Sequence, residues 1–294
     1  MGVFLTKDAR VVVQGITGNE GSFWTEKMIE SGTNVVAGVT PGKGGERVHG
    51  VPVYNAVREA VRDKGANTSV IYVPPMFCKD ACLEALDAGC TRIVVLADGV
   101  PVQDTIEMKT MAKEKNAMVI GPNTSGVSTI GVGMLGFMPM WLTYVFSPGP
   151  VGVVTRSGSL TNEVCSFLVK EGLGETSTIC CGGDPVPGTR FADIALLFEA
   201  DPDTKALLMV GEPGGSMEEE VVDLVKAGRF TKPIVAFLAG RTAPPEKRMG
   251  HAGAIVSGGK GTIEGKTAAI EGVGGVVIRK PCEAGTAMAK LLRR

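Results

Sequence analysis

Short runs of β-branched residues alternate with amphipathic helical segments, and this alternation constrains the fold more than any other feature of the chain. Strands that alternate with helices form parallel sheets whose crossover helices cover the sheet faces. Helices are expected from about Gly21 to Glu30 and from about Asp80 to Gly89. In the first 120 residues we predict strands at residues 10–14, 35–39, 70–73, 93–96 and 118–120.

The pattern stops between Pro122 and Pro150, where prolines and large apolar side chains are typical of a connecting segment. It then resumes, and 294 residues are enough for two separate cores. A second set of strands is predicted at residues 151–155, 178–180, 206–210, 234–238 and 276–278. The predicted fold is α/β, with two tandem doubly wound parallel sheets: a Rossmann-like domain over residues 1–122, a linker over 123–150 and a flavodoxin-like domain over 151–294.

Charge and composition exclude several classes of partner. The 30 Lys and Arg residues balance 31 Asp and Glu residues, which gives a net charge of −1 and no basic footprint for nucleic acid or an anionic membrane. The apolar runs are too short to span a membrane, so we expect a soluble cytoplasmic protein. Seven cysteines without a C-x-x-C pair, and only two histidines, predict reduced thiols and no metal site.

A glycine-rich turn, QGITGNEG over residues 14–21, follows the first strand and opens the first helix. Backbone N–H groups at such a helix start bind phosphate, and glycine lets the ligand approach closely. The spacing is G-x-x-G-x-x-G, and no acidic residue closes the second strand to hold a ribose, which disfavours NAD. A purely structural tight turn remains the alternative at this point.

The second strand runs into VTPGKGG, which places Lys43 between glycines at the carboxyl end of the sheet. Ligands of doubly wound sheets bind at that end, where Lys43 could neutralise a phosphate. The segments 73–75 and 96–99 end two further strands on the same rim. Together these loops predict a pocket for an adenine-ribose-phosphate group.

In the second domain, TRSGSL over residues 155–160 is again a strand, a glycine turn and a helix start. Ser157, Gly158 and Ser159 would direct N–H and hydroxyl groups at an anion. A serine hydrolase is disfavoured, because G-x-S-x-G is absent and no second histidine is available in this domain as a triad base.

One of the two histidines, His251, lies among glycines in the fragment RMGHAGA over residues 248–254. An approachable imidazole on an open loop can act as a phosphoryl-accepting nucleophile, although such a histidine can also simply hydrogen-bond the backbone. Glu212 ends another predicted strand and could fix the tautomer of the imidazole. Ser216 and Glu219 predict a capping box for the helix that follows.

In this order, the motifs resemble those of the α subunit of succinate–CoA ligase, in the superfamily of nucleoside-diphosphate-forming acyl-CoA synthetases. The resemblance covers essentially the whole chain. The motifs that carry it are QGITG, VTPGKGG, IYVPP, GPN, TRSG, GGDP, GE-x-GG and TAPP-x-x-R-MGHAGAI. It implies a subunit that binds CoA and works with an ATP-grasp β partner in an αβ or α2β2 assembly, where the partner binds ATP or GTP with Mg²⁺.

The resemblance also implies a role for particular residues. His251 would be the phosphohistidine and Glu212 its partner. The helix start at Ser157, Gly158 and Ser159 would receive the phosphate, with Asn162 beside the acid substrate. The positions implied to contact CoA are Thr17, Gly18, Asn19, Glu20, Lys43, Val73, Pro74, Leu96, Ala97, Asp98, Asn123 and Thr124.

Three positions depart from the family pattern: Thr124 stands where Cys is frequent, Asp98 where Glu is usual, and Asn162 where a Tyr is associated with binding the acid. The segments 161–163 and 228–235 resemble those of ATP-citrate lyase and citryl-CoA synthetase. We therefore expect a succinate–CoA ligase, with a citryl-CoA or malyl-CoA synthetase as the alternative. A CoA-binding regulatory module and an NAD-dependent oxidoreductase are the alternatives from other classes.

Overall fold

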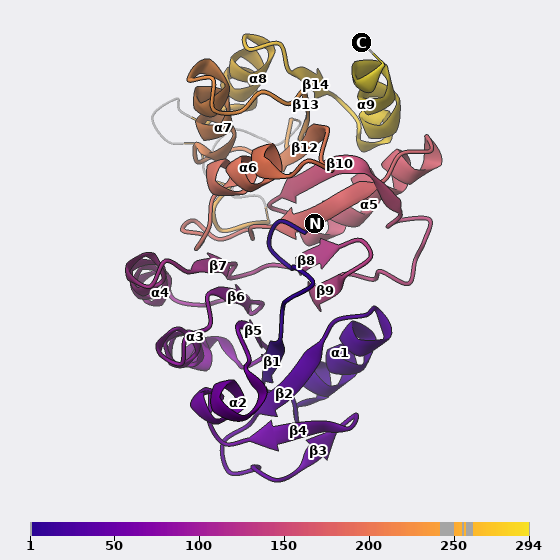
Figure 1. The fold of residues 1–294 in the computed structure, drawn as a ribbon. Coiled ribbons are helices and arrows are strands. Elements are labelled where there is room, and N and C mark those ends of the chain that lie inside the picture. The colour runs from indigo at the N-terminus through magenta and orange to yellow at the C-terminus, as the bar shows by residue number, and fades with distance from the viewer. Residues whose placement is uncertain (1, 242–249, 255, 257–260, 294) are drawn as a thin grey trace. The chain divides into compact units, whose positions relative to one another are not determined.

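The computed structural model describes residues 2–241, 250–254, 256 and 261–293 (Figure 1). The chain divides into two compact units, each with its own parallel sheet. The N-terminal unit consists of Phe4–Met138 and Val186–Thr189. The C-terminal unit consists of Met1–Val3, Pro139–Pro185 and Arg190–Arg294. The fragment that carries His251 is described from Gly250 onward, so Arg248, Met249 and the TAPP segment of the motif lie outside the described residues.

The sheet of the N-terminal unit has the order β3-β4-β2-β1-β5-β6-β7. All neighbouring strands are parallel except β3, which pairs antiparallel with β4. Without β3, the order is the 3-2-1-4-5-6 sequence of a Rossmann fold. The strands are β1 Val11–Gln14, β2 Val35–Val39, β3 Arg47–Val48, β4 Val51–Tyr54, β5 Thr68–Ile71, β6 Arg92–Val95 and β7 Met118–Ile120.

Helices cover both faces of this sheet, with α1 on one face and α2, α3 and α4 on the other (Figure 1). The inner strands β1 and β5 are buried along their whole length. Strand β1 is a continuous apolar run up to Gln14, as expected for a strand covered on both faces, whereas β5 begins with the buried polar residues Thr68 and Ser69. The expected helices were placed to within two residues, but α2 and α4 were not predicted. The helices are α1 Asn19–Glu30, α2 Val57–Lys64, α3 Cys78–Asp87 and α4 Val102–Glu114, with a 3₁₀ turn at Pro75–Phe77.

A β-hairpin lies within the segment that the sequence suggested was a linker. Strands β8 Gly126–Thr129 and β9 Gly133–Gly136 pair antiparallel and are fully buried. The sequence pattern did not reveal these strands, because glycine, which strands normally avoid, stands at the start of β8 and at both ends of β9. At Gly126, a Cβ atom would lie 1.8 Å from the Leu135 carbonyl oxygen, so the close approach of the two strands requires glycine there.

In the C-terminal unit, five parallel strands have the order β14-β13-β12-β10-β11. Numbered along the chain, this is the 2-1-3-4-5 order of flavodoxin-like sheets. The strands are β10 Pro148–Thr155, β11 Glu175–Cys180, β12 Ala206–Gly211, β13 Ile234–Leu238 and β14 Val276–Ile278. All five were predicted, and β10 and β11 begin three residues earlier than expected.

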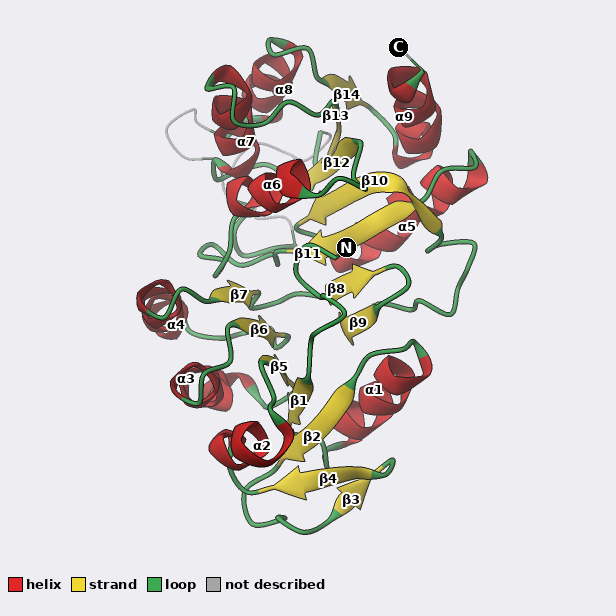
Figure 2. Cartoon of the chain, in the orientation of Figure 1, coloured by secondary structure: helices red, strands yellow, loops and turns green. Residues whose placement is uncertain are grey.

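The helices of this unit again lie on both sheet faces, α5 and α9 on one and α6, α7 and α8 on the other (Figure 2). They are α5 Gly158–Lys170, α6 Phe191–Ala200, α7 Met217–Lys226, α8 Ile263–Glu271 and α9 Ala284–Leu292, with a 3₁₀ turn at Pro281–Glu283. The predicted α/β class with two tandem parallel sheets is therefore confirmed.

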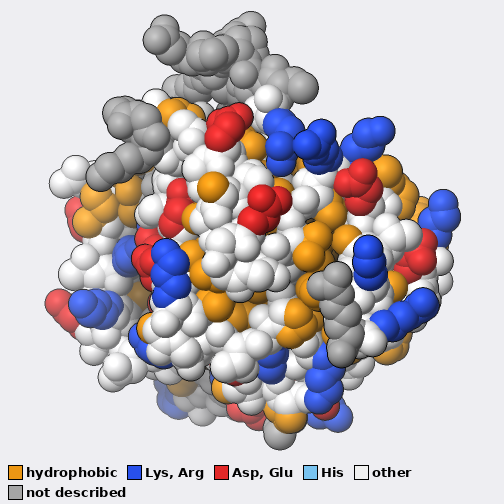
Figure 3. Space-filling view, turned by 90° about the horizontal axis from the view of Figure 1, so that it is seen from above, with side chains coloured by type: hydrophobic (Ala, Val, Ile, Leu, Met, Phe, Trp, Pro, Cys, Tyr) orange, Lys and Arg blue, Asp and Glu red, His pale blue; other side chains and the backbone are white. Residues whose placement is uncertain are grey.

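The distribution of charged side chains on the surface agrees with the net charge of −1. On the face drawn in Figure 3, Lys and Arg side chains are interspersed with Asp and Glu side chains. No helix among the described residues is long and apolar enough to cross a membrane. The seven cysteines are all free thiols, and Cys78 and Cys82 are buried, as ordinary packing predicts.

Candidate functional site

Three charged or titratable side chains meet at the carboxyl edge of the C-terminal sheet. Arg156 follows β10, Glu212 follows β12, and His251 lies in the segment between β13 and α8. The carboxyl ends of parallel strands meet at one edge, and in the 2-1-3-4-5 order β10 stands at the point where the chain reverses direction across the sheet. Residues far apart in the sequence are thereby brought into direct contact.

Glu212 is the centre of this cluster. Its Oε2 lies 2.6 Å from His251 Nδ1, and its Oε1 lies 2.9 Å from Arg156 Nη1. Glu212 is 8% exposed and Arg156 is 4% exposed, whereas the His251 side chain is 28% exposed. The carboxylate and the guanidinium are therefore fixed in the interior, while part of the imidazole remains accessible.

Arg156 is itself held by the loop that follows β11. Its Nη2 donates to the Asp184 carbonyl at 2.7 Å and its Nε to the Gly182 carbonyl at 3.3 Å. The buried guanidinium thus has two carbonyl acceptors and one carboxylate partner, and such partners reduce the cost of burying a charge. This charge offsets that of Glu212, because the Glu212 carboxylate would be costly to bury alone.

The contact with Glu212 determines the protonation of His251. The hydrogen bond to the carboxylate raises the pKa of the imidazole; burial opposes this, and the Glu212 charge reinforces it. A carboxylate can only accept, so in the neutral imidazole the proton stays on Nδ1. Nε2 is then the nitrogen with a free lone pair, on the side of the ring away from Glu212.

Two glycines allow the cluster to close. A Cβ atom on Gly183 would lie 2.5 Å from His251 Cγ and Cδ2, so the backbone packs directly against the imidazole ring. A Cβ atom on Gly253 would lie 2.3 Å from Arg156 Nη2. Side chains at these positions would displace the histidine or the arginine, which explains the GGDP and HAG sequences.

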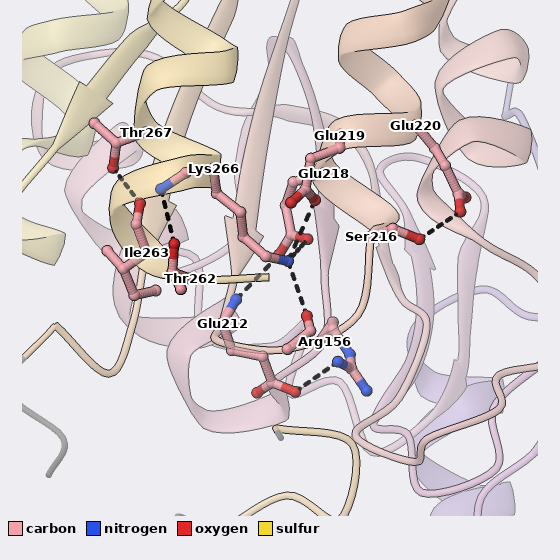
Figure 4. A network of polar contacts seen from close by, with 12 residues as sticks. Arg156, Glu212, Ser216, Glu218, Glu219, Glu220, Thr262, Ile263, Lys266 and Thr267 are labelled. Atoms are coloured by element: carbon pink, nitrogen blue, oxygen red, sulfur yellow. Dashed lines mark hydrogen bonds and ion pairs between the residues drawn. The ribbon is translucent and has the colours of Figure 1, made fainter. Parts of the chain in front are cut away.

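Behind Glu212, two buried residues of α7 and α8 reach the same segment (Figure 4). Glu218 Oε1 accepts a hydrogen bond from the Glu212 backbone N–H at 3.1 Å, and Lys266 Nζ donates to Glu218. The predicted capping box is wrong. Ser216 is the N-cap residue of α7, but its hydroxyl donates to Glu220 instead of capping the helix, and Glu219 faces Lys266.

The start of α5 lies next to Arg156 in the chain. Ser157 is the N-cap residue, and its hydroxyl accepts from the Leu160 N–H at 3.4 Å. The N–H groups of Gly158 and Ser159 belong to the first turn, where a helix provides no backbone acceptor. Ser159 is exposed and Asn162 is half-buried one turn further along, with its Oδ1 buried and without a hydrogen-bond partner among the described residues.

The N-terminal unit presents a second helix start of the same kind. Gly15, with a φ of 81°, turns the chain between β1 and α1, and Gly18 is the N-cap residue without a side-chain cap. Thr17 is half-buried and its hydroxyl bonds Thr40, which joins the loops after β1 and β2. Gly18, Asn19 and Glu20 are exposed, so the backbone of this turn is open to an anion.

The other predicted CoA residues follow neighbouring strands of the same sheet. Lys43 is exposed in the turn after β2, where the N–H groups of Gly42 and Gly44 donate to Asn55. Val73 is half-buried and Pro74 exposed in the segment after β5. In the order of this sheet, β1 lies between β2 and β5, so these loops flank the Gly15 turn.

The loops after β6 and β7 complete the same edge. Ala97 and Asp98 are accessible, and Asn123 donates its N–H to the Ala97 carbonyl at 2.8 Å. Leu96 and Thr124 are 5% and 4% exposed, and the Thr124 hydroxyl accepts from the Gly126 N–H. Their side chains are part of the interior, so only their backbone could contribute to a ligand site.

Sequence reasoning missed several members of the C-terminal cluster. Arg156 lies in the TRSG motif and Gly183 in the GGDP motif. The basic side chain in TRSG could have indicated Arg156 as a member of the site. No local pattern indicated Glu218 or Lys266, which pair across 48 residues.

Among the described residues, no group of His, Cys, Asp or Glu side chains is arranged to hold a metal ion.

Comparisons with known proteins agree with the two-unit architecture. Residues 6–99 match the CoA binding domain model and residues 154–276 match the CoA-ligase model. Both the fold and these matches define a CoA ligase subunit, with the CoA-binding domain first.

Relatives match along the full length. The chain is 55% identical to the ADP-forming sulfoacetate-CoA ligase subunit SauD of Bilophila wadsworthia, over 99% of this chain and 100% of the relative. It is 48% identical to the succinate–CoA ligase [ADP-forming] subunit alpha of Aquifex aeolicus, over 100% of this chain and 95% of the relative. The chain belongs to the family of ADP-forming CoA ligase α subunits that includes those of succinate–CoA ligase.

A solved structure has the same fold. The ATP citrate lyase of Methanothrix soehngenii, in complex with citrate and coenzyme A, is 25% identical with a TM-score of 0.88. The match covers 98% of this chain and 50% of the lyase chain, so the chain spans half the length of that relative.

Proposed function

We propose that this chain is the catalytic α subunit of an ADP-forming acid–CoA ligase in which His251 carries a phosphoryl group from a nucleotide to the acid. The observation that supports this most directly is the contact between His251 Nδ1 and Glu212 Oε2 at 2.6 Å. It leaves Nε2 as the nucleophile, on a ring that is partly accessible.

Each step is a displacement on an activated group. Nε2 attacks the γ-phosphorus, the bond to the departing nucleoside diphosphate breaks, and phosphohistidine forms. A carboxylate oxygen of the acid then attacks phosphorus, the N–P bond breaks, and an acyl phosphate forms. The CoA thiol loses its proton and its sulfur attacks the acyl carbon, which releases inorganic phosphate and the thioester.

The residues of the C-terminal unit suit the charges of this sequence. Glu212 stabilises the positive charge that develops on the imidazole as Nε2 forms its new bond, as the carboxylate of a catalytic triad does. The first-turn N–H groups at Gly158 and Ser159 are available to the transferred phosphoryl oxygens. This helix start directly follows Arg156, which holds Glu212.

The nucleotide is assigned to a partner subunit with an ATP-grasp fold, together with its Mg²⁺. The chain has no Walker-type G-x-x-x-x-G-K-[ST] sequence of its own. Relatives that match over their full length are named as ligase subunits, which supports a two-subunit enzyme. CoA is assigned to the carboxyl edge of the N-terminal sheet, with its phosphates at the Gly15–Gly18 turn and Lys43.

For the acid, we propose a short molecule with two anionic groups, with sulfoacetate as the first candidate and succinate as the second. Relatives named as sulfoacetate-CoA ligase subunits are 55% and 49% identical, compared with 48% for succinate–CoA ligase subunits. Asn162 is smaller than the Tyr of the succinate pattern and carries two amide donors. It leaves room for a tetrahedral sulfonate in place of a planar carboxylate.

The test is CoA-thioester formation by the chain reconstituted with its ATP-grasp partner, with sulfoacetate, succinate, malate and citrate compared at equal concentration. We expect a higher kcat/KM for sulfoacetate than for the other three acids. In Asn162→Tyr, the ratio of kcat/KM for succinate to that for sulfoacetate should rise. A preference for citrate or malate would contradict the proposed acid, and thioester formation without phosphorylation of His251 would contradict the mechanism.

A further inference from the structure

Glu218 and Lys266 form an ion pair in the interior of the C-terminal unit, directly behind Glu212. Lys266 is 0% exposed and Glu218 is 1% exposed. Lys266 Nζ donates to Glu218 Oε2 and lies 3.6 Å from Glu219 Oε2. The pair joins α8 to the first turn of α7, and Figure 4 shows it near the backbone nitrogen of Glu212, whereas Arg156 lies at the Glu212 carboxylate.

The pair contacts the backbone that carries Glu212 at two points. Glu218 Oε1 accepts from the Glu212 N–H at 3.1 Å, and Lys266 Nζ donates to the Gly214 carbonyl at 2.9 Å. The Gly214 N–H in turn donates to the Gly261 carbonyl at 2.8 Å, just before α8. Hydrogen bonds therefore hold the segment from Glu212 to Gly214 at the Glu212 N–H, the Gly214 carbonyl and the Gly214 N–H.

Gly211 makes this approach possible. A Cβ atom at this last residue of β12 would lie 2.0 Å from Glu218 Oε1. The φ of Gly211 is not in the left-handed region, so the backbone conformation alone does not require glycine. The glycine is needed because the Glu218 carboxylate occupies the space where a side chain would stand.

The energetics of such a pair indicate a positional role. Burying two charges costs about as much as their attraction returns, and well-packed apolar replacements of a buried pair are often neutral or stabilising. An apolar pair, however, could neither accept from the Glu212 N–H nor donate to the Gly214 carbonyl. The advantage of Glu218 and Lys266 over apolar residues therefore lies in fixing this segment.

We infer that Glu218 and Lys266 are positioning residues that hold Glu212 in place for phosphoryl transfer at His251. This inference rests on the proposed function, since it concerns the same site. Glu212 contacts both His251 and Arg156, so a shift of its backbone would lengthen both contacts together. Neither positioning residue touches the imidazole, and each acts through Glu212.

The test compares two double variants in the complex with the ATP-grasp partner. Glu218→Met/Lys266→Met removes both backbone contacts and leaves neither charge of the pair unpaired. It also removes the 3.6 Å contact of Lys266 with Glu219, a loss that the second variant shares. Glu218→Gln/Lys266→Met also removes the ion pair, but the Gln carbonyl can still accept from the Glu212 N–H. The control is Lys232→Met, which removes another lysine of this unit whose ammonium donates to the carbonyls of Phe198 and Asp201.

With γ-labelled ATP, the Met/Met variant should phosphorylate His251 about tenfold or more slowly than the unsubstituted complex, as is typical when a group that orients a histidine is lost. The Gln/Met variant should recover much of this rate, and Lys232→Met should match the unsubstituted complex. In the Met/Met variant the pKa of His251, followed by NMR in a complex labelled only in this chain, should fall towards its ordinary value.

Equal labelling rates and an equal His251 pKa in Met/Met and Lys232→Met would overturn the inference. So would a Gln/Met variant as slow as Met/Met, because the lost contact would then not be the acceptor of the Glu212 N–H. If Met/Met does not fold, Lys266→Met is compared with Lys232→Met by the same criteria. Failure of the unsubstituted complex to label His251 would contradict the proposed function instead, and the His251 pKa would still test the positioning.

Discussion

The Glu212 carboxylate joins two basic side chains, with Oε2 2.6 Å from His251 Nδ1 and Oε1 2.9 Å from Arg156 Nη1. The two carboxylate oxygens of Glu212 have different partners and different effects. One fixes the imidazole tautomer, and the other pairs with a buried cation that offsets the charge of the carboxylate. The tautomer and the raised pKa of His251 therefore depend on a residue that comes 39 positions earlier in the chain.

Glu212→Gln should slow phosphorylation of His251 by about two to four orders of magnitude, because a neutral amide neither stabilises the imidazolium nor enforces the tautomer with Nε2 free. The measurement is the single-turnover rate of labelling by γ-labelled ATP in the complex with the partner. Glu220→Gln is the control, since it removes a carboxylate of α7 that pairs with Arg190. A Glu212→Gln rate within a factor of two of the control would contradict the role of Glu212.

The pH dependence of labelling should follow the raised pKa of His251. The hydrogen bond to Glu212 favours the doubly protonated ring, which has no lone pair for attack. The labelling rate should therefore rise with pH, with a midpoint above the ordinary histidine value of about 6.5. In Glu212→Gln the midpoint should move down. A midpoint that is the same in both proteins would mean that another group controls the profile.

Gly183→Ala should abolish most labelling of His251 while the protein stays folded. The added methyl group would lie 2.5 Å from two ring carbons, so the imidazole must move away from its position against Glu212. The backbone of Gly183 is not in the left-handed region, so the effect comes from the ring and not from strain. The measurement is the labelling rate, together with the melting temperature.

The matched control for Gly183→Ala is Gly272→Ala at the C-cap of α8, where the backbone is right-handed helical. That variant should keep its labelling rate, and its stability should change by less than about 1 kcal/mol. A Gly183→Ala protein that labels as fast as Gly272→Ala would show that the ring has space to shift without loss of function.

Local sequence patterns encode some elements of this fold, and tertiary packing determines the others. The predicted strands were found because strands buried on both faces are continuous apolar runs, as at residues 206–210. The short β4 was missed because Pro52 interrupts it, and the hairpin of β8 and β9 because glycines border its strands.

The same distinction holds for the site. His251 and Glu212 were proposed from their glycine-rich surroundings and strand-end position, which are local signals. The Lys266–Glu218 pair could not be found in this way, because a lysine and a glutamate on separate helices resemble any solvated residues until the fold buries them. Burial could not be predicted from a motif either, since Leu96 lies in the interior with 5% of its surface exposed, and its place in the CoA site stays a prediction.

Lys43→Ala should weaken CoA binding about tenfold, which corresponds to about 1.4 kcal/mol for one lost charge-assisted contact to phosphate. His251 labelling by ATP should not change, because the first phosphoryl transfer does not involve CoA. Calorimetric titration of the complex with CoA measures the first effect. Lys113→Ala, an exposed lysine of α4, is the control. Equal CoA affinity in the two variants would remove Lys43 from the proposed site.

Glu175→Gln should stabilise the protein above neutral pH. Burial raises the pKa of the Glu175 carboxyl to about 8, whereas in the unfolded chain the carboxyl ionises near its ordinary value. Between these two values the unfolded state releases the proton and the folded state retains it, so the free energy of unfolding falls as pH rises to about 8. The Gln side chain avoids this loss, and its carbonyl can still accept from the Ser147 N–H.

The measurement for Glu175→Gln is the melting temperature of variant and unsubstituted protein at pH 5 and pH 8.5. Each kcal/mol gained corresponds to about 2–4 °C in a domain of roughly this size. The gain should be larger at the higher pH, because only there does the unsubstituted protein have to ionise a buried carboxyl. Glu171→Gln, which changes an exposed carboxyl in the same unit, should give no such difference. A gain that is equal at both pH values would show that the carboxyl of Glu175 is not held protonated by the fold.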